Sequence, residues 1–277
     1  MSASQAVPVI IWPARVSIFQ HLSRLAGHWE LFLTLLLRDI KVRYRQSVLG
    51  LYWAVLHPVA IALVFTLAFS FIVRISTGDV PYFLFALAGL PAWNFFGHGL
   101  ADSTESLVRH TNLVTKVAFP KELLPLSSVC ARALDFFGSL IVVVALSLIL
   151  GQGIHPSLLW VPFVFILLTL FTTGLGLFFA MSNLYFRDMR QVVTVLLPLW
   201  MYMTPIIYPP DLVPEAFRFL LWLNPLAGLV TATRNAVLYG TSPDWLPLLS
   251  TVVATLVVLT LAYVLFKRKE PAFAEVV

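Results

Sequence analysis

The chain has 277 residues, of which 60% are hydrophobic and only 11% are charged, with a net charge of +5. Soluble domains carry about 25% charged residues, so a soluble fold of this size could not cover so much apolar surface. The cations stand at the ends of apolar runs, which argues against nucleic-acid binding, and the one cysteine, Cys130, excludes an intrachain disulfide framework or a Cys-rich metal site.

The first 50 residues are predicted to stay on the cytoplasmic side of a membrane. Residues 1–27 are expected to be a tail that is not removed as a signal peptide, because their apolar run is short and interrupted by proline. Residues 28–50 are expected to form an amphipathic interface helix. On a wheel of about 100° per residue, one face is polar: Thr34, Arg38, Lys41 and Arg45. The other face is apolar: Trp29, Leu33, Leu36, Ile40 and Tyr44.

The rest of the chain is predicted to be an all-α polytopic membrane domain, residues 51–266. Its six apolar runs are long enough to be membrane spans: 51–73, 83–101, 124–150, 158–182, 192–208 and 246–266. The second run is interrupted by Pro91, Asn94 and His98, so a broken or re-entrant element is an alternative there.

The distribution of Lys and Arg predicts the orientation. Fourteen of them lie before residue 51, in the 102–123 and 183–191 loops, or in the C-terminal tail, whereas the alternate loops carry three. The positive-inside rule then puts both termini in the cytoplasm. The last outer loop, 209–245, is long and semi-apolar, and we expect two short helices in it, split at Pro225 and closed by Tyr239 and Gly240.

The 102–123 loop is predicted to contain a short cytoplasmic helix. Asp102 or Ser103 would cap its N-terminus, with Glu105 in the first turn, and Pro120 would end it before the next span. Such a helix is suited to receive motion from an attached motor. An ordinary solvated connector fits the same spacing.

Polar and small residues inside the spans suggest helix contacts. Arg132 and Asp135 are three residues apart and are expected to form a structural pair, with a substrate site as the alternative. His57 and His98 are expected to be helix contacts or pore residues. Glycines at positions 174 and 176 predict close packing between spans.

The motifs that are absent exclude several kinds of chemistry. The sequence has no G-x-x-x-x-G-K-[ST], no H-E-x-x-H, no Cys pair and no G-x-S-x-G. Without a phosphate-binding loop this chain is not expected to bind ATP itself. If ATP powers it, a separate subunit binds the nucleotide.

Four blocks of the sequence resemble, in order, the membrane subunits of type-2 ABC exporters of polysaccharide, the family of O-antigen, teichoic acid and capsule exporters. The first is R-D-I-K-x-R-Y-x-x-S-x-L-G-x-x-W-x-x-L-x-P, residues 38–58, and the second is N-L-V-x-K-x-x-F-P-x-E-L-L-P, residues 112–125. The third is Y-F-R-D, residues 185–188. The fourth is M-T-P-I-I-Y-P followed by L-N-P-L, between residues 203 and 226.

The resemblance implies a homodimeric permease in the bacterial inner membrane, bound to two ATPase subunits that hold ATP and Mg, and exporting a lipid-linked polysaccharide. No cofactor or metal is expected in this chain. Contacts with the ATPase are expected from ten residues: Arg38, Lys41, Arg43, Arg45, Glu105, Arg109, Lys116, Lys121, Arg187 and Asp188. The channel between protomers is expected to present aromatic side chains, on which sugars stack: Trp53, Phe65, Phe69, Trp200, Tyr202 and Tyr208.

Two other functions are weighed against this one. The same architecture serves type-2 permeases for a drug or a small lipid. An integral-membrane enzyme acting on polyprenyl-linked sugars would need clustered acidic or His residues at one membrane face, and the sequence shows only scattered ones.

Overall fold

The computed structural model describes residues 27–45 and 52–276, and every regular element in these ranges is helical. Most of the expected N-terminal tail, the 46–50 part of the expected interface helix and the first residue of the expected first span lie outside the described residues.

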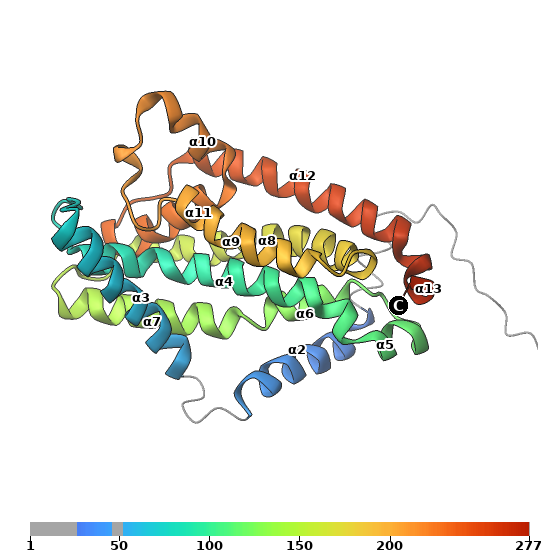
Figure 1. Cartoon of the computed structure of the whole chain (residues 1–277). Helices are drawn as coiled ribbons and strands as arrows, with labels where there is room; N and C mark the ends of the chain where they lie inside the picture. The colour runs from blue at the N-terminus through green and yellow to red at the C-terminus, as the bar shows by residue number, and fades with distance from the viewer. Residues whose placement is uncertain (1–26, 46–51, 277) are drawn as a thin grey trace, which may run out of the picture.

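The long helices run side by side along one axis (Figure 1). They are α3 (Trp53–Phe65) with its π-helical continuation η2 (Thr66–Ile72), α4 (Tyr82–Arg109), α7 (Ala133–Ile149), α8 (Val161–Tyr185), α9 (Met189–Met203) and α12 (Trp245–Lys269). The expected interface helix is α2 (Trp29–Tyr44), which lies against the outside of the bundle. Short elements complete the chain: α5 (Thr111–Lys116), α6 (Leu123–Cys130), η3 (Pro156–Trp160), η4 (Pro210–Leu212), η5 (Glu215–Phe217), α10 (Arg218–Leu223), α11 (Pro225–Arg234), η6 (Asn235–Tyr239), η7 (Glu270–Ala272) and α13 (Phe273–Val276).

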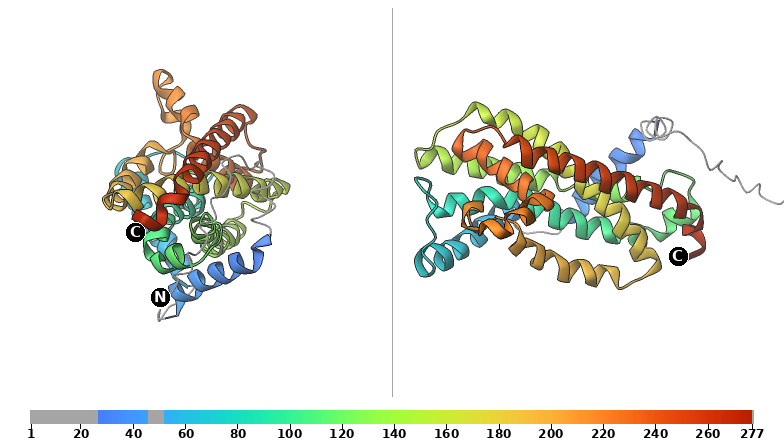
Figure 2. Two further views of the ribbon diagram at one scale, coloured as in Figure 1. Left: turned by 90° about the vertical axis from the view of Figure 1, so that its right-hand side faces the viewer. Right: turned by 90° about the horizontal axis from the view of Figure 1, so that it is seen from above.

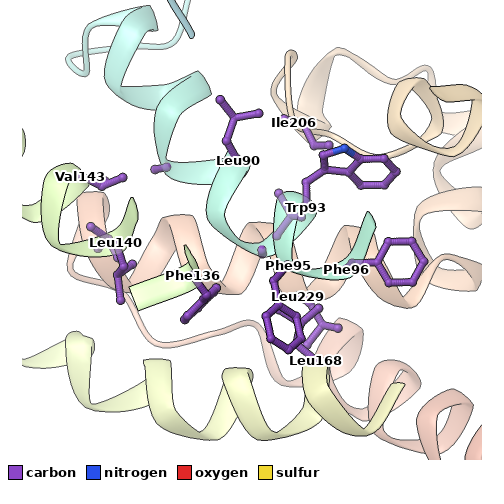
Figure 3. Packing of buried hydrophobic residues seen from close by; sticks show 14 of the residues in the cluster. Leu90, Trp93, Phe95, Phe96, Phe136, Leu140, Val143, Leu168, Ile206 and Leu229 are labelled. Carbon is purple, nitrogen blue, oxygen red and sulfur yellow. The ribbon is translucent and has the colours of Figure 1, made fainter. Parts of the chain in front are cut away.

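Helix α4 is the centre of the bundle. It contacts α3, α6, α7, α8, α9 and α11, and most of its side chains are buried. Phe95 and Phe96 pack there against residues of α7 and α8 (Figure 3). The helix is continuous through Pro91, so the broken or re-entrant alternative for the second span is wrong. Because neighbouring helices cover α4, its polar and small residues need not face lipid.

Four helical segments are long and apolar enough to cross a membrane: Val55–Ile72, Leu123–Ile149, Pro156–Tyr185 and Trp245–Val276. The pair Glu215–Leu223 and Pro225–Tyr239, bent by 93°, makes a fifth if it counts as one span. These candidate segments coincide with four of the six expected spans; the six-span topology, including the spans at 83–101 and 192–208, stays a prediction. Helix α9 ends at Met203, five residues before the expected end, because Thr204 precedes a proline and takes an extended conformation.

The two short helices expected in the 209–245 segment are present as α10 and α11. Asn224 separates them, and its side-chain oxygen accepts a hydrogen bond from the backbone N–H of Leu226 at 3.1 Å. The π-helical continuation of α11 ends at Gly240, whose φ of +65° is the left-handed conformation that favours glycine. Helix α10 projects from the rest of the bundle (Figures 1 and 2).

The predicted close packing at two glycines of α8 is confirmed. A Cβ at Gly174 would lie 3.0 Å from the Cα of Leu259 in α12, and one at Gly176 would lie 3.0 Å from the Cβ of Ser103 in α4. Helix α8 therefore approaches both neighbours more closely than a side chain would allow.

We expect Gly174→Ala to destabilise the bundle by about 1–3 kcal/mol, because the new methyl group meets backbone atoms that cannot rotate away. The measurement is the melting temperature of the purified chain in detergent. Gly97→Ala is the matched control, since the nearest atom to its new Cβ would be 3.8 Å away. Equal melting temperatures for the two variants would contradict the packing argument.

Candidate functional site

Two arginines and two aspartates from three helices meet at the end of the bundle that holds α5. Arg43 of α2 bonds to Asp102 of α4 at 3.1 Å and to Asp135 of α7 at 3.2 Å. Arg132, which precedes α7, bonds to the same two carboxylates at 2.7 and 3.2 Å. All four side chains are between 15 and 21% exposed, so solvent screens these charges only in part. We call these four residues the ion cluster.

The predicted pair of Arg132 and Asp135 is confirmed, but it is only half of this cluster. Tyr44 of α2 also donates a hydrogen bond to Asp135. Burial, followed by that bond, raises the pKa of Tyr44 to about 12. One turn earlier, Asp39 accepts a hydrogen bond from Ser128 of α6 at 3.0 Å. Helix α2 is therefore fixed to α4, α6 and α7.

The capping role expected at the start of the 102–123 loop is wrong. Asp102, Ser103 and Glu105 lie within the last turns of α4, and the short helix of this loop is α5. The hydroxyl groups of Ser103 and Thr104 both donate to the carbonyl of Leu100, at 3.0 and 2.7 Å. The residue types at positions 102–105 predicted the start of a new helix. Instead, α4 continues through these residues, because it packs there against α8.

The predicted coupling residues on α2 and α4 divide into bonded and exposed ones. Lys41 and Arg45 are exposed, whereas Arg38 pairs with Asp39 at 3.0 Å and Arg43 points into the ion cluster. On α4, Glu105 bonds to Arg109 at 2.8 Å and to Arg190 of α9 at 2.7 Å. Arg190 is not among the predicted coupling residues, and its ion pair with Glu105 ties the 183–191 loop to α4.

The remaining predicted coupling residues follow the same division. Lys116, Arg187 and Asp188 are exposed. Lys121 closes the C-terminus of α5 by donating to the carbonyls of Leu113 and Val117. The predicted coupling residues that are exposed and make no ion pair in the described residues therefore lie at α2, α5 and the 183–191 loop, next to internally bonded ones.

A second ion pair fixes the C-terminal part of the chain to the same end of the bundle. Lys267 of α12 bonds to Glu122 at 2.7 Å and to Glu270 at 2.8 Å. Glu270 also accepts a hydrogen bond from the backbone N–H of Lys121 at 3.1 Å. Burial raises the pKa of Glu122, and the Lys267 ammonium opposes that shift. Helix α13 and α5 lie together as a result (Figure 1).

The six predicted channel aromatics do not form one group in the single chain. Tyr202 is 63% exposed and Trp53 is 50% exposed. Phe65, Phe69 and Tyr208 are partly buried against the hydrophobic core.

Trp200 is also partly buried, and it makes specific contacts with three other residues. Its ring packs 5.2 Å from that of Phe96 and 6.3 Å from that of Phe171, and its Nε1 donates to Asn224 at 3.0 Å. This tryptophan joins α9 to the bend between α10 and α11. Tyr202 and Trp53 are the candidates that the fold leaves accessible.

The two histidines expected to be helix contacts or pore residues lie next to each other. The rings of His57 in α3 and His98 in α4 are 6.0 Å apart, and both side chains are exposed. His98 is therefore an exposed residue beside α3, although its neighbours along α4 are buried.

Arg234 is fully buried at the opposite end of the bundle, and the sequence interpretation counted it only as a loop cation. Its guanidinium donates to the backbone carbonyls of Phe85, Pro205 and Ile206, at 3.1, 2.9 and 2.8 Å. It also lies 3.7 Å from the centroid of the Phe85 ring. A Cβ at Gly89 would be 2.7 Å from the guanidinium, so only glycine leaves room for it. Arg234 thereby joins α11, α4 and the segment after α9.

We expect Asp102→Asn to destabilise the chain by about 2 kcal/mol, because two arginines would then share one carboxylate. This is less than the roughly 3–5 kcal/mol lost when a fully buried ion pair is broken, because the side chains of the ion cluster are partly exposed. The measurements are the melting temperature in detergent and the rate of proteolysis at α2. Glu30→Gln on the exposed side of α2 is the control, since it removes the same charge outside the ion cluster. A variant at position 102 that behaves like this control would show that the cluster does not hold α2.

The amino-acid sequence can be compared with known proteins. Residues 30–238 match the family described as ABC-2 type transporter. The O-antigen export system permease protein RfbA of Myxococcus xanthus is 32% identical over 247 residues, which are 88% of this chain and 94% of that protein. The RfbA protein of Klebsiella pneumoniae is 31% identical over 76% of this chain and 82% of its own length. The polysialic acid transport protein KpsM of Escherichia coli is 28% identical over 86% of this chain and 93% of its own length.

The family match covers the four sequence blocks and the residues of the ion cluster, α5 and Arg234. It names a class of transporter, which decides against the membrane-enzyme alternative. The chain therefore belongs to the ABC-2 type transporter family, as a multi-pass membrane component of a transporter and not an enzyme.

Proposed function

We propose that this chain is the permease of an ATP-driven exporter that moves a lipid-linked polysaccharide out of the cytoplasm. The observation that carries this proposal is the similarity to two kinds of transport protein whose names specify polysaccharides, O-antigen and polysialic acid, over most of each chain. Two copies of the chain would enclose the channel, and two ATPase subunits would bind ATP and Mg. In this proposal α4 and α9 are the second and fifth of six spans, and both termini are cytoplasmic.

The exposed charges at the α5 end are the proposed contacts with the ATPase. Lys41 lies on α2 and Arg45 directly after it, Lys116 lies on α5, and Arg187 and Asp188 lie in the 183–191 loop. A nucleotide-driven displacement of these surfaces would reach the bundle through bonded residues. The ion cluster would carry it from α2 to α4 and α7, and the pair of Glu105 and Arg190 would carry it from α4 to α9.

The proposed channel surface is the accessible part of α3 and α9. Tyr202 and Trp53 present aromatic rings there, and His57 and His98 present imidazoles beside α3. An aromatic ring can stack on the C–H groups of a sugar while the hydroxyls stay hydrated, so a glycan could pass without a tight binding site.

The proposed function is tested by co-purification and by one charge reversal. A tagged chain extracted gently from its native membrane should bring an ATPase with a Walker-A motif in equal amount.

Lys116→Glu should lower glycan export by about tenfold or more, because it reverses a charge on the proposed ATPase contact. The melting temperature should not change, because the lysine side chain is exposed and makes no bond to other described residues. Arg74→Glu, at an exposed residue of the opposite end, is the control. Full export by the Lys116 variant would remove α5 from the coupling surface.

We expect Tyr202→Ala to reduce glycan export several-fold while leaving the melting temperature unchanged, because the ring is mostly exposed in the single chain. Trp200→Ala should lower the melting temperature instead, since it removes a packed ring and the partner of Asn224, at a cost of about 3–5 kcal/mol. The measurements are surface glycan in cells and melting in detergent. If Tyr202→Ala exports normally, this tyrosine does not line the channel.

A further inference from the structure

A pocket of mixed lining, which includes charged, hydroxyl and amide side chains, meets an apolar groove below α10. The pocket has a volume of about 290 Å³ and is lined by residues of η4, α10, α11, η6 and the start of α12. The groove has a volume of about 500 Å³ and runs along α12. Trp222 of α10 lines both, so the two spaces form one continuous surface with a polar and an apolar part.

The polar part carries charges of both signs that have no ion-pair partner in the described residues. Asp211 and Asp244 are exposed on its rim, and neither carboxylate makes a hydrogen bond or an ion pair in the part of the chain that the structure describes. Arg218 lines the same pocket and, within the part of the chain that the structure describes, bonds only to the backbone carbonyl of Val213, at 3.2 Å. Thr231 and Asn235 add hydroxyl and amide groups from the floor. A ligand that offers one cation and one anion would match this set.

The apolar part has the length of one membrane leaflet. Its stripe on α12 begins at Leu246, continues through Leu249 and Val253, and ends at Val257. A helix rises about 1.5 Å per residue, so this stripe covers roughly 16 Å. Half of the hydrocarbon core of a bilayer is about 15 Å. A phospholipid acyl chain therefore fits along it, whereas a polyprenyl chain is longer and its phosphates bring no cation to match the two carboxylates.

We propose that this surface is a binding site for a phospholipid with an amine headgroup, such as phosphatidylethanolamine. The ammonium would bond to Asp211 and Asp244, the phosphate to Arg218, and one acyl chain would lie beside Trp222 and along α12. Bound there, the lipid bridges α10 and α12, and it supports the helix that projects from the bundle in Figures 1 and 2.

This inference goes beyond the proposed export function. The proposed orientation of the chain puts this site in the outer leaflet of the membrane. Only that placement rests on the proposed function. The preference for a headgroup follows from the pocket itself and does not depend on which substrate is exported. Failure of lipid binding and failure of export are therefore separate results.

The experiment is native mass spectrometry of the purified, delipidated full chain, titrated with phosphatidylethanolamine or phosphatidylglycerol that carry the same acyl chains. We expect saturable uptake of both lipids. Phosphatidylethanolamine should bind with an affinity about fivefold higher than phosphatidylglycerol, because its ammonium would form two partly exposed ion pairs with the aspartates. The double variant Asp211→Asn, Asp244→Asn should bind the two lipids equally. Arg218→Gln should weaken both, and Val253→Trp, which fills the groove, should weaken both while keeping the preference.

Asp79→Asn is the matched control, because it removes an exposed carboxylate outside the pocket and should keep the full preference. Three results would overturn the proposal. One is equal, non-saturating uptake of both lipids, as expected for bulk lipid around any membrane protein. Another is a preference that survives in the double variant. The third is lipid uptake by the monomer that disappears in a dimer, which would mean that a second copy covers the groove.

Discussion

The ion cluster at the α5 end determines how the chain can move, because it joins three helices through four charges. Asp102 belongs to the central helix α4, Arg43 to the peripheral helix α2, and Arg132 and Asp135 to the beginning of α7. Each arginine has two carboxylate partners and each carboxylate two arginines, so the charges balance within the cluster. In a partly buried site, loss of one member leaves an uncompensated charge, which makes independent motion of α2 unfavourable. The helix is therefore part of the bundle's rigid body.

The opposite end of α4 is fixed by a different kind of interaction. Arg234 donates to three backbone carbonyls and stacks on Phe85, and no carboxylate pairs with it in the described residues. Carbonyl dipoles and an aromatic face stabilise the cation there. Two of the carbonyls, those of Pro205 and Ile206, belong to the segment after α9. Because that segment has lost its helical bonding, its carbonyls are free to accept, and the arginine satisfies them.

The sequence predicted those features that depend on neighbouring residues in the chain. The split between two short helices at Pro225, the close packing at Gly174 and the pair of Arg132 and Asp135 are of this kind, and the structure confirms them. The role of Asp102 was not predictable in this way, since its arginine partners are 30 and 59 residues away. For Trp200, hydropathy predicted a position in an apolar run but not whether the ring would face a neighbouring helix or an open surface. Arg234 gave no signal either, because backbone carbonyls as partners leave no trace in the sequence.

Fixation of α4 at both ends limits how the proposed channel opens. A displacement received at α5 or α2 cannot bend α4 locally without breaking the ion cluster, and at the other end the bonds of Arg234 oppose it. Under the proposed function, the displacement would therefore move the bundle as one body, and the gap to a second copy would widen where the chain has least internal packing. The exposed sides of α3 and α9 meet this condition, because α3 packs against α4 and α7 and α9 packs against α4 and α8, while the rest of each helix stays uncovered. They carry Trp53 and Tyr202, so the surface that separates from a second copy would also be the one that offers aromatic rings to a passing glycan.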